Sequence, residues 1–273
     1  MPLLLLHGLL GNSSNLKTLS SSLHKEQPTS EPPPLILDTR GHGASPPSAD
    51  IPANTPSDLP HCGRDVAETV CALTSSRGVS AVVGHSFGGK QALAYLNDVL
   101  TFGQCPPPEA VWLLDTMPGA VPRTGENKQG SVKSVIDAVA SITSISSRKS
   151  LVSDLESLGV DPGVAQWMTT NVTKDSSGSL KFMFDVPTVR SLYSSYSECD
   201  YLPLLASLSG GPTTVHLVRA TRNEAWAHVE GEMAALTKGN PNVVIHDVDS
   251  GHWVHQEKMR EVVDLIKPTI ATR

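Results

Sequence analysis

The fold can be inferred from one segment, Val79-Ser80-Ala81-Val82-Val83-Gly84-His85-Ser86-Phe87-Gly88-Gly89-Lys90. Its first residues form a short apolar run that predicts a buried strand, and helical periodicity resumes after about Gly88. Between them lies the turn G-x-S-x-G. A strand, this turn and a helix in immediate succession are the setting of a nucleophile elbow, which exposes its serine above a sheet. A glycine-rich turn without chemistry is the alternative interpretation.

Steric requirements explain the two glycines of this elbow. The turn holds Ser86 in a strained backbone conformation, so the residues two positions before and after it, Gly84 and Gly88, must lack side chains. The helix that follows points its N-terminus at the serine hydroxyl, which favours negative charge developing there. Ser86 is therefore the candidate nucleophile.

Strands and amphipathic helices alternate on both sides of the elbow. This alternation implies right-handed crossovers and an α/β fold, with a mostly parallel sheet flanked by helices. Between the apolar runs, apolar residues recur at helical spacing, which predicts amphipathic helices. The last of these helices carries an apolar stripe of Met259, Val262, Val263 and Ile266. We expect strands at residues 3–6, 35–37, 79–83, 111–114, 213–218 and 243–245.

Helical patterns replace this alternation between residues 119 and 197, interrupted by polar breaks at 123–130 and 174–178. We therefore expect a helical cap at 119–197, inserted into a core formed by residues 1–118 and 198–273. Proline-rich segments, such as residues 46–60, are expected to be loops.

Composition excludes several classes of protein. The 273 residues are 39% hydrophobic and 18% charged, with a net charge of −6, which indicates a globular chain and argues against a nucleic-acid or anionic-membrane partner. No apolar run approaches the length of a membrane span. The four cysteines, which are scattered and form no C-x-x-C pattern, are expected to be reduced thiols: Cys62, Cys71, Cys105 and Cys199. No metal or cofactor is expected.

His252 is the candidate base, because it follows a strand and precedes the last helix, at the carboxyl end of the sheet where open α/β sheets place their sites. A surface-loop histidine is the alternative. We expect His255 to start a helix, and we interpret His216, His228 and His246 as structural.

The acid is harder to assign. The position just after the strand at 213–218 carries no early carboxylate, and Glu224 comes late. Asp115 ends the preceding strand, where a carboxylate costs desolvation unless another group uses it. Since neighbouring strands lie about 4.8 Å apart, Asp115 can reach an imidazole above Ser86. Asp115 is our candidate acid, with Glu224 or a residue not singled out as alternatives.

A second glycine turn, His7-Gly8-Leu9-Leu10-Gly11, follows the first strand. In an H-G-x-x-G turn the backbone N–H of Leu9 would bind an oxyanion together with the N–H of Phe87. A plain turn is the alternative. We interpret residues 38–43 as structural, with Asp38 and Arg40 fixing a loop and His42 outside the chemistry.

The blocks H-G-x-x-G, D-x-R-G-H-G, G-H-S-F-G-G and G-H-W together resemble the α/β-hydrolase superfamily, over residues 7–252. Finer motifs are similar to those of α/β hydrolase domain-containing protein 11 and the bacterial YbfF-type esterases: Gly88-Gly89-Lys90, Gln166-Trp167-Met168-Thr169-Thr170-Asn171, Gly251-His252-Trp253-Val254-His255 and Asp115-Thr116-Met117-Pro118. The resemblance implies an α/β-hydrolase fold with the cap after the sixth strand of the family. It also implies that Asp115 is the acid of a Ser-His-Asp triad.

The sequence departs from this subgroup in three places. Gly41 stands where the subgroup usually has Asn, and Arg219-Ala220-Thr221-Arg222 replaces Gly-Gly-Asn-Ser. The H-G block starts at residue 7, so the N-terminal hairpin of the family is missing. We expect either an exposed sheet edge or a chain that is an incomplete version of a longer one. The default localisation is cytoplasmic, or mitochondrial if the N-terminus is incomplete.

These observations predict a serine hydrolase that cleaves carboxylic esters or thioesters of small to medium acyl groups, with a small-molecule substrate and an acyl-enzyme intermediate. Carbon–carbon bond hydrolysis, a lyase step on the same triad, or a non-catalytic receptor on this fold stay open. Trp167, Met168 and Phe184, with Phe182, are candidates for the acyl pocket, although core packing is the preferred interpretation.

Overall fold

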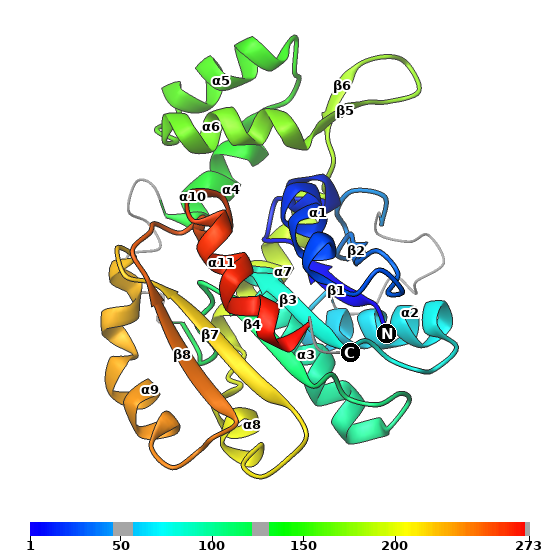
Figure 1. The fold of residues 1–273 in the computed structure, drawn as a ribbon. Coiled ribbons are helices and arrows are strands. Elements are labelled where there is room, and N and C mark those ends of the chain that lie inside the picture. The colour runs from blue at the N-terminus through cyan, green and yellow to red at the C-terminus, as the bar shows by residue number, and fades with distance from the viewer. Residues whose placement is uncertain (46–56, 122–130, 271–273) are drawn as a thin grey trace.

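A parallel sheet of six strands forms the centre of the molecule, in the order β2-β1-β3-β4-β7-β8 (Figure 1). The structure is a computed structural model and describes residues 1–45, 57–121 and 131–270. All neighbouring strands of the sheet pair in parallel, which confirms the predicted α/β class. The strands are β1 (Leu3–Leu6), β2 (Leu35–Leu37), β3 (Ala81–His85), β4 (Ala110–Leu114), β7 (Thr214–Ala220) and β8 (Val243–Val248).

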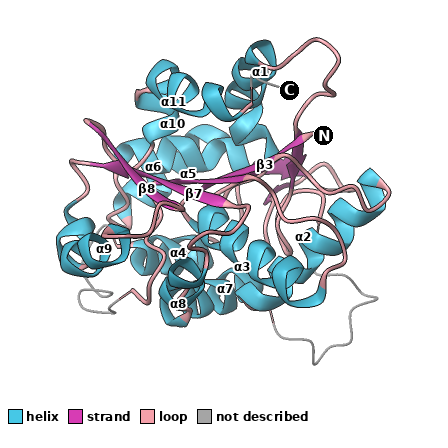
Figure 2. Cartoon of the chain, turned by 60° about the horizontal axis from the view of Figure 1, so that its bottom comes forward, coloured by secondary structure: helices cyan, strands magenta, loops and turns pink. Residues whose placement is uncertain are grey.

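Helices cover both faces of the sheet (Figure 2). On one face lie α1 (Lys17–Glu26) and α11 (Met259–Ile266), with the short α10 (Val254–Glu257) beside them. On the other lie α2 (Leu59–Thr74), α3 (Phe87–Phe102), α8 (Leu202–Ser207) and α9 (Glu230–Thr237).

The apolar core follows this layering. Side chains of a strand alternate between its two faces, so Leu4 and Leu6 of β1 join the cluster under α2 and α3, whereas Leu3 and Leu5 join the cluster under α1 and α11. All four leucines are fully buried. The apolar run at the start of the sequence is therefore a central strand, as expected from its pattern.

The chain between β4 and β7 carries α4 (Val132–Ser141), α5 (Arg148–Ser157), α6 (Pro162–Met168) and α7 (Val186–Glu198). Most of its apolar side chains form one cluster, which Leu10 of the core also joins. Besides these helices the segment contains an antiparallel hairpin of β5 (Val172–Lys174) and β6 (Leu180–Phe182), whose connection includes most of the predicted polar break at 174–178. Gly178, at a φ of 85°, closes its turn, and Asp175 accepts hydrogen bonds from backbone N–H groups within it.

Two further expectations concern loops. The predicted break at 123–130 and most of the proline-rich segment 46–60 lie outside the described residues. The end of that segment is helical, because Asp58 caps α2 through the N–H of His61, and Pro60 fits the first turn of a helix. No helix in the described ranges has the length and hydropathy to cross a membrane.

Candidate active site

Ser86 stands at the tip of the turn between β3 and α3. Every residue from Ala81 to Leu96 is buried except Ser86, which is half-buried. Its φ of 54° lies in the left-handed region, where a residue with a side chain is strained. A Cβ on Gly84 would collide with the carbonyl of Gly88, and a Cβ on Gly88 would collide with the carbonyl of Leu6. The steric reason for both glycines is thus visible in the packing.

His252 and Asp115 come together from two loops at the carboxyl end of the sheet. Nδ1 of His252 lies 2.6 Å from Oδ2 of Asp115, which follows β4. The Asp115 residue is 4% exposed, and its backbone also has a positive φ, 48°. Glu224, the alternative acid, lies exposed at the start of the short 3₁₀ helix Glu224–His228.

Three further donors hold the Asp115 carboxylate. Oδ1 accepts the backbone N–H of Ala220 at 3.2 Å and the indole N–H of Trp226 at 2.6 Å, and Oδ2 accepts Nδ2 of Asn223 at 2.7 Å. Together with His252, these groups give the Asp115 carboxylate four hydrogen-bond donors, and an ionised carboxylate has only acceptor oxygens. Sequence reasoning missed Asn223 and Trp226. Their position after β7, across from the strand of Asp115, is the signal that could have found them.

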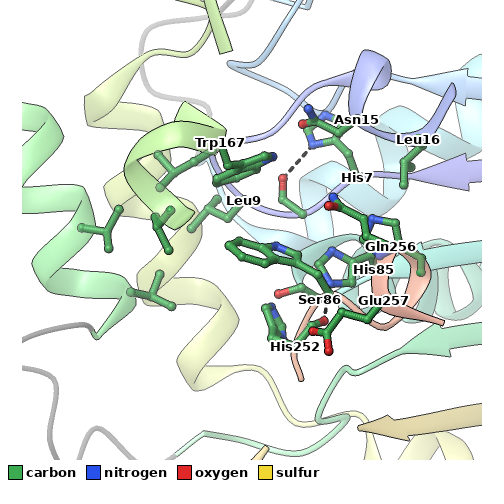
Figure 3. Close-up of a pocket in the computed structure, with 17 residues that line it drawn as sticks. His7, Leu9, Asn15, Leu16, His85, Ser86, Trp167, His252, Gln256 and Glu257 are labelled. Carbon is green, nitrogen blue, oxygen red and sulfur yellow. Dashed lines mark hydrogen bonds between the residues drawn. The ribbon is translucent and has the colours of Figure 1, made fainter. Parts of the chain in front are cut away.

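Ser86 and His252 line one cavity of about 460 Å³ (Figure 3). The described hydrogen bonds of the His252 ring include Asp115 and not Ser86. In enzymes without substrate this bond is often long and tightens when substrate binds. The ring of His85 lies 4.8 Å from that of His252, and Nε2 of His85 donates to the backbone carbonyl of His252 at 2.9 Å.

Two backbone N–H groups beside Ser86, those of Leu9 and Phe87, have no hydrogen-bond acceptor within the described part of the chain. Phe87 is the first residue of α3, where N–H groups lack partners in the helix. Leu9 lies in the turn closed by the bond from Gly11 N–H to the Gly8 carbonyl. Gly8 is in close contact with Ser86, since a Cβ there would lie 3.6 Å from the Ser86 Cβ.

Buried histidines fix this turn. Nε2 of His42 accepts the N–H of Leu10 at 3.2 Å and its Nδ1 donates to the Arg40 carbonyl, while Nε2 of His7 accepts the N–H of Thr39. These bonds support Leu10 at a φ of 64°. Burial lowers the pKa of His42 to about 3 and also lowers that of His7, so both rings are neutral.

The loop at residues 38–43 has the expected structural role. Asp38 accepts the N–H groups of Ser13 and Ala44, and Arg40 forms a bidentate pair with Asp65. Gly41, which departs from the subgroup, has a φ of 74°, and a Cβ there would collide with Thr188 of α7. A close approach of α7 therefore explains this glycine.

Arg222, the second departure, anchors the loop of His252. Its guanidinium pairs with Glu257 of α10 and lies 3.5 Å from Asp249. Its backbone N–H donates to the Ser250 carbonyl, and Glu257 accepts the N–H of Gly251 at 3.1 Å. The segments on both sides of His252 are thus tied to one ion pair.

One of the three candidate pocket residues lines the cavity. Trp167 forms part of its wall, with Leu9 and Leu10 from the core (Figure 3). Met168 and Phe184 instead pack in the apolar cluster of residues 135–189, because Met168 points into that cluster and Phe184 packs on Phe182 and His42. Sequence reasoning missed three aliphatic lining residues: Val132, Val135 and Val164.

Three of the remaining histidines have described surroundings. His216 and His246 stack with Trp112 on the strands, and His255 lies at the start of α10. His255 also lines the cavity, and burial lowers its pKa to about 4. Among residues 1–45, 57–121 and 131–270, no cluster of three or more His, Cys, Asp or Glu side chains has the arrangement of a metal site.

Comparison with known proteins agrees with this geometry. Residues 3–265 match the model of the alpha/beta hydrolase family, and the chain belongs to that family. It is 24% identical over 270 residues to the "sn-1-specific diacylglycerol lipase ABHD11" of Xenopus tropicalis, covering 97% of this chain and 76% of that protein. It is 25% identical to the "Abhydrolase domain-containing protein C22H12.03" of Schizosaccharomyces pombe, and the match covers 97% of this chain and 90% of that protein.

Solved structures share the fold at lower sequence identity. A structure titled "Marine microorganism esterase" superposes with a TM-score of 0.76 and 16% identity, covering 98% of this chain and 94% of that one. A structure of E-2-(acetamidomethylene)succinate hydrolase superposes with a TM-score of 0.69 and 17% identity, covering 98% of this chain and 91% of that one. These similarities extend over the whole sheet and its helices.

Proposed function

We propose that this protein is a serine ester hydrolase, acting on carboxylic esters or thioesters of small to medium acyl groups through Ser86, His252 and Asp115. One observation carries the proposal: His252, bonded to the buried Asp115 at 2.6 Å, shares a cavity with the half-buried Ser86 on a strained elbow. Nucleophile, base and orienting acid are the parts that acyl transfer requires.

In the proposed reaction, Oγ of Ser86 attacks the substrate carbonyl carbon and His252 takes the hydroxyl proton. Asp115 keeps Nδ1 of His252 protonated and stabilises the imidazolium. The N–H groups of Leu9 and Phe87 hold the oxyanion. The bond to the alcohol or thiol breaks as His252 returns the proton to that leaving group. Water, which gives a proton to His252, then attacks the acyl-enzyme. The bond between the acyl carbon and Oγ of Ser86 breaks, the acid is released, and His252 returns the proton to Oγ.

We further propose that residues 119–197 act as a cap that supplies the acyl-binding wall. Val135, Val164 and Trp167 reach the cavity from this segment, and a volume of about 460 Å³ suits a small to medium acyl chain. The names of two relatives, a diacylglycerol lipase and an esterase, are consistent with ester chemistry.

Covalent labelling tests the proposal. A fluorophosphonate probe is expected to label the wild type at Ser86, and Ser86→Ala is expected to abolish labelling and to lower kcat on p-nitrophenyl esters by at least about 1,000-fold. Ser250→Ala, which changes a buried serine in the neighbouring loop, is the control and should keep both the labelling and the kcat of the wild type. A wild type that neither labels nor cleaves any member of a panel of esters and thioesters would contradict the proposal.

A further inference from the structure

Lys90 is a buried cation that the proposed reaction does not use. It lies on α3, one turn after Ser86, and its side chain is fully buried. Lysine is seldom buried without an acidic partner, because desolvating an ammonium is costly. No described ion pair includes Lys90. Burial lowers its pKa to about 8, against the opposing effect of Cys199 and Asp200, so the ammonium is retained at neutral pH.

The partners of Lys90 are two backbone carbonyls far apart in sequence. Nζ donates to the carbonyl of Gly119 at 2.7 Å and to that of Tyr196 at 2.5 Å, and it lies 4.3 Å from the centre of the Tyr196 ring. Charged donors and a cation–π contact of this kind offset the cost of burial. Two carbonyls and a ring therefore form a site built for this ammonium.

Both carbonyls lie at the junction between the core and the segment that carries the cavity wall. Gly119 follows β4, where the chain leaves the core, and Tyr196 lies near the end of α7, where the chain returns. The two passages are also bonded to each other, from Val121 N–H to the Ser197 carbonyl and from Tyr201 N–H to the Pro118 carbonyl. Figure 2 shows α3 and α7 on the same face of the sheet.

We infer that Lys90 is a positioning residue that fixes both ends of the cap to the helix of the nucleophile and so sets the acyl-binding wall above Ser86. The inference rests on the proposed function of Ser86. The Tyr196 ring also packs against Phe87, at 6.1 Å between ring centres, so the same junction contacts a residue of the proposed oxyanion hole. Val135, Val164 and Trp167, which lie between the two fixed ends, line the cavity proposed to bind the acyl chain.

The test compares a short and a longer ester in Lys90→Met, which keeps the length of the side chain and removes its donors. For p-nitrophenyl octanoate, whose longer chain is expected to extend to the cap wall, kcat/KM is expected to fall about tenfold or more, mainly through KM, because loss of the bonds from the charged donor releases the wall. For p-nitrophenyl acetate, kcat/KM should stay within about threefold. Rates are normalised to the sites that a fluorophosphonate labels.

Thr74→Val is the matched control, because it removes a buried hydroxyl at the end of α2, away from the junction, that donates to the Val70 carbonyl and accepts the N–H of Gly78. Thr74→Val should leave the ratio of kcat/KM between p-nitrophenyl octanoate and p-nitrophenyl acetate unchanged. Hydrogen exchange adds a readout independent of catalysis: the amides of Val121 and Tyr201 should exchange about tenfold faster in Lys90→Met, with the amides of β3 unchanged. If this variant does not fold, Lys90→Gln, whose shorter amide cannot reach both carbonyls, is measured in the same way.

Equal losses for both esters, or unchanged exchange at Val121 and Tyr201, would overturn the inference and leave Lys90 a packing residue. Failure of the proposed function is distinguishable, because the wild type would then neither label nor cleave the esters. The exchange measurement would still report whether Lys90 holds the junction.

Discussion

The indole N–H of Trp226 donates to Oδ1 of Asp115 at 2.6 Å, on the oxygen opposite the one that His252 contacts. A bond of this kind orients the carboxylate toward the imidazole. Trp226→Phe is expected to lower kcat on p-nitrophenyl acetate about tenfold, because it removes one bond to a charged acceptor. Trp112→Phe is the control, since it removes an indole bond to Thr269 on the other face of the sheet. Equal kcat in Trp226→Phe and the wild type would contradict the expectation.

A variant of His42 tests the proposed oxyanion role of the turn at residues 7–11. Nε2 of His42 accepts the N–H of Leu10, which is held at a positive φ next to Leu9, whose own N–H has no acceptor among the described residues. His42→Leu leaves the Leu10 N–H without an acceptor, at a cost of about 1–3 kcal/mol, and should displace Leu9. We expect kcat to fall about tenfold or more with a smaller change in KM, measured on short esters. His42→Gln offers an acceptor oxygen and should recover part of kcat. A change confined to KM would argue against a role in the oxyanion turn.

The ion pair of Arg222 and Glu257 gives a third prediction. Arg222 is more than half exposed, so the pair contributes at most about 1 kcal/mol. Arg222→Ala should therefore lower kcat about two- to fivefold by loosening the loop of His252. Arg219→Ala breaks a similar pair with Asp247, which joins β7 to β8, and should leave kcat unchanged. Equal effects of the two variants would show that Arg222 does not position His252.

Buried neutral histidines make stability depend on pH. Burial lowers the pKa of His42 to about 3, that of His255 to about 4 and that of His85 well below its usual value, against about 6.5 in the unfolded chain. The unfolded chain therefore binds more protons below pH 6.5, and stability present above that pH is lost as pH falls toward 4. At pH 5, His42 and His255 each lower the free energy of unfolding by about 2 kcal/mol relative to pH 7.5.

The measurement is the thermal midpoint between pH 7.5 and pH 5, where we expect a decrease of at least about 5 °C. His255→Phe should reduce this decrease, because it removes one of the rings that protonation destabilises. Within the described residues the Nδ1 of His255 has no hydrogen-bond partner that the substitution would lose. An unchanged midpoint over this range would show that these rings are not held neutral.

Local patterns determined most of the architecture. Residues 3–6 and 81–85 form buried strands because apolar runs bounded by turns have few other solutions, and the glycines flanking Ser86 can be read as a steric requirement of the elbow. The position of Asp115 after its strand could be inferred as well, since parallel strands end at one edge of the sheet. Its hydrogen bond to His252 agrees with that prediction.

Other features depend on contacts between distant segments, which no local pattern encodes. The sequence could not tell that Met168 packs inward while its neighbour Trp167 faces the cavity, because that depends on how the helices between β4 and β7 pack together. It could not show that Trp226 and Asn223 complete the shell of Asp115, more than 100 residues away. Lys90 is the clearest case: a charged residue on a helix is expected in solvent, and only the folded chain brings the Gly119 and Tyr196 carbonyls to its ammonium, where they compensate for the loss of water.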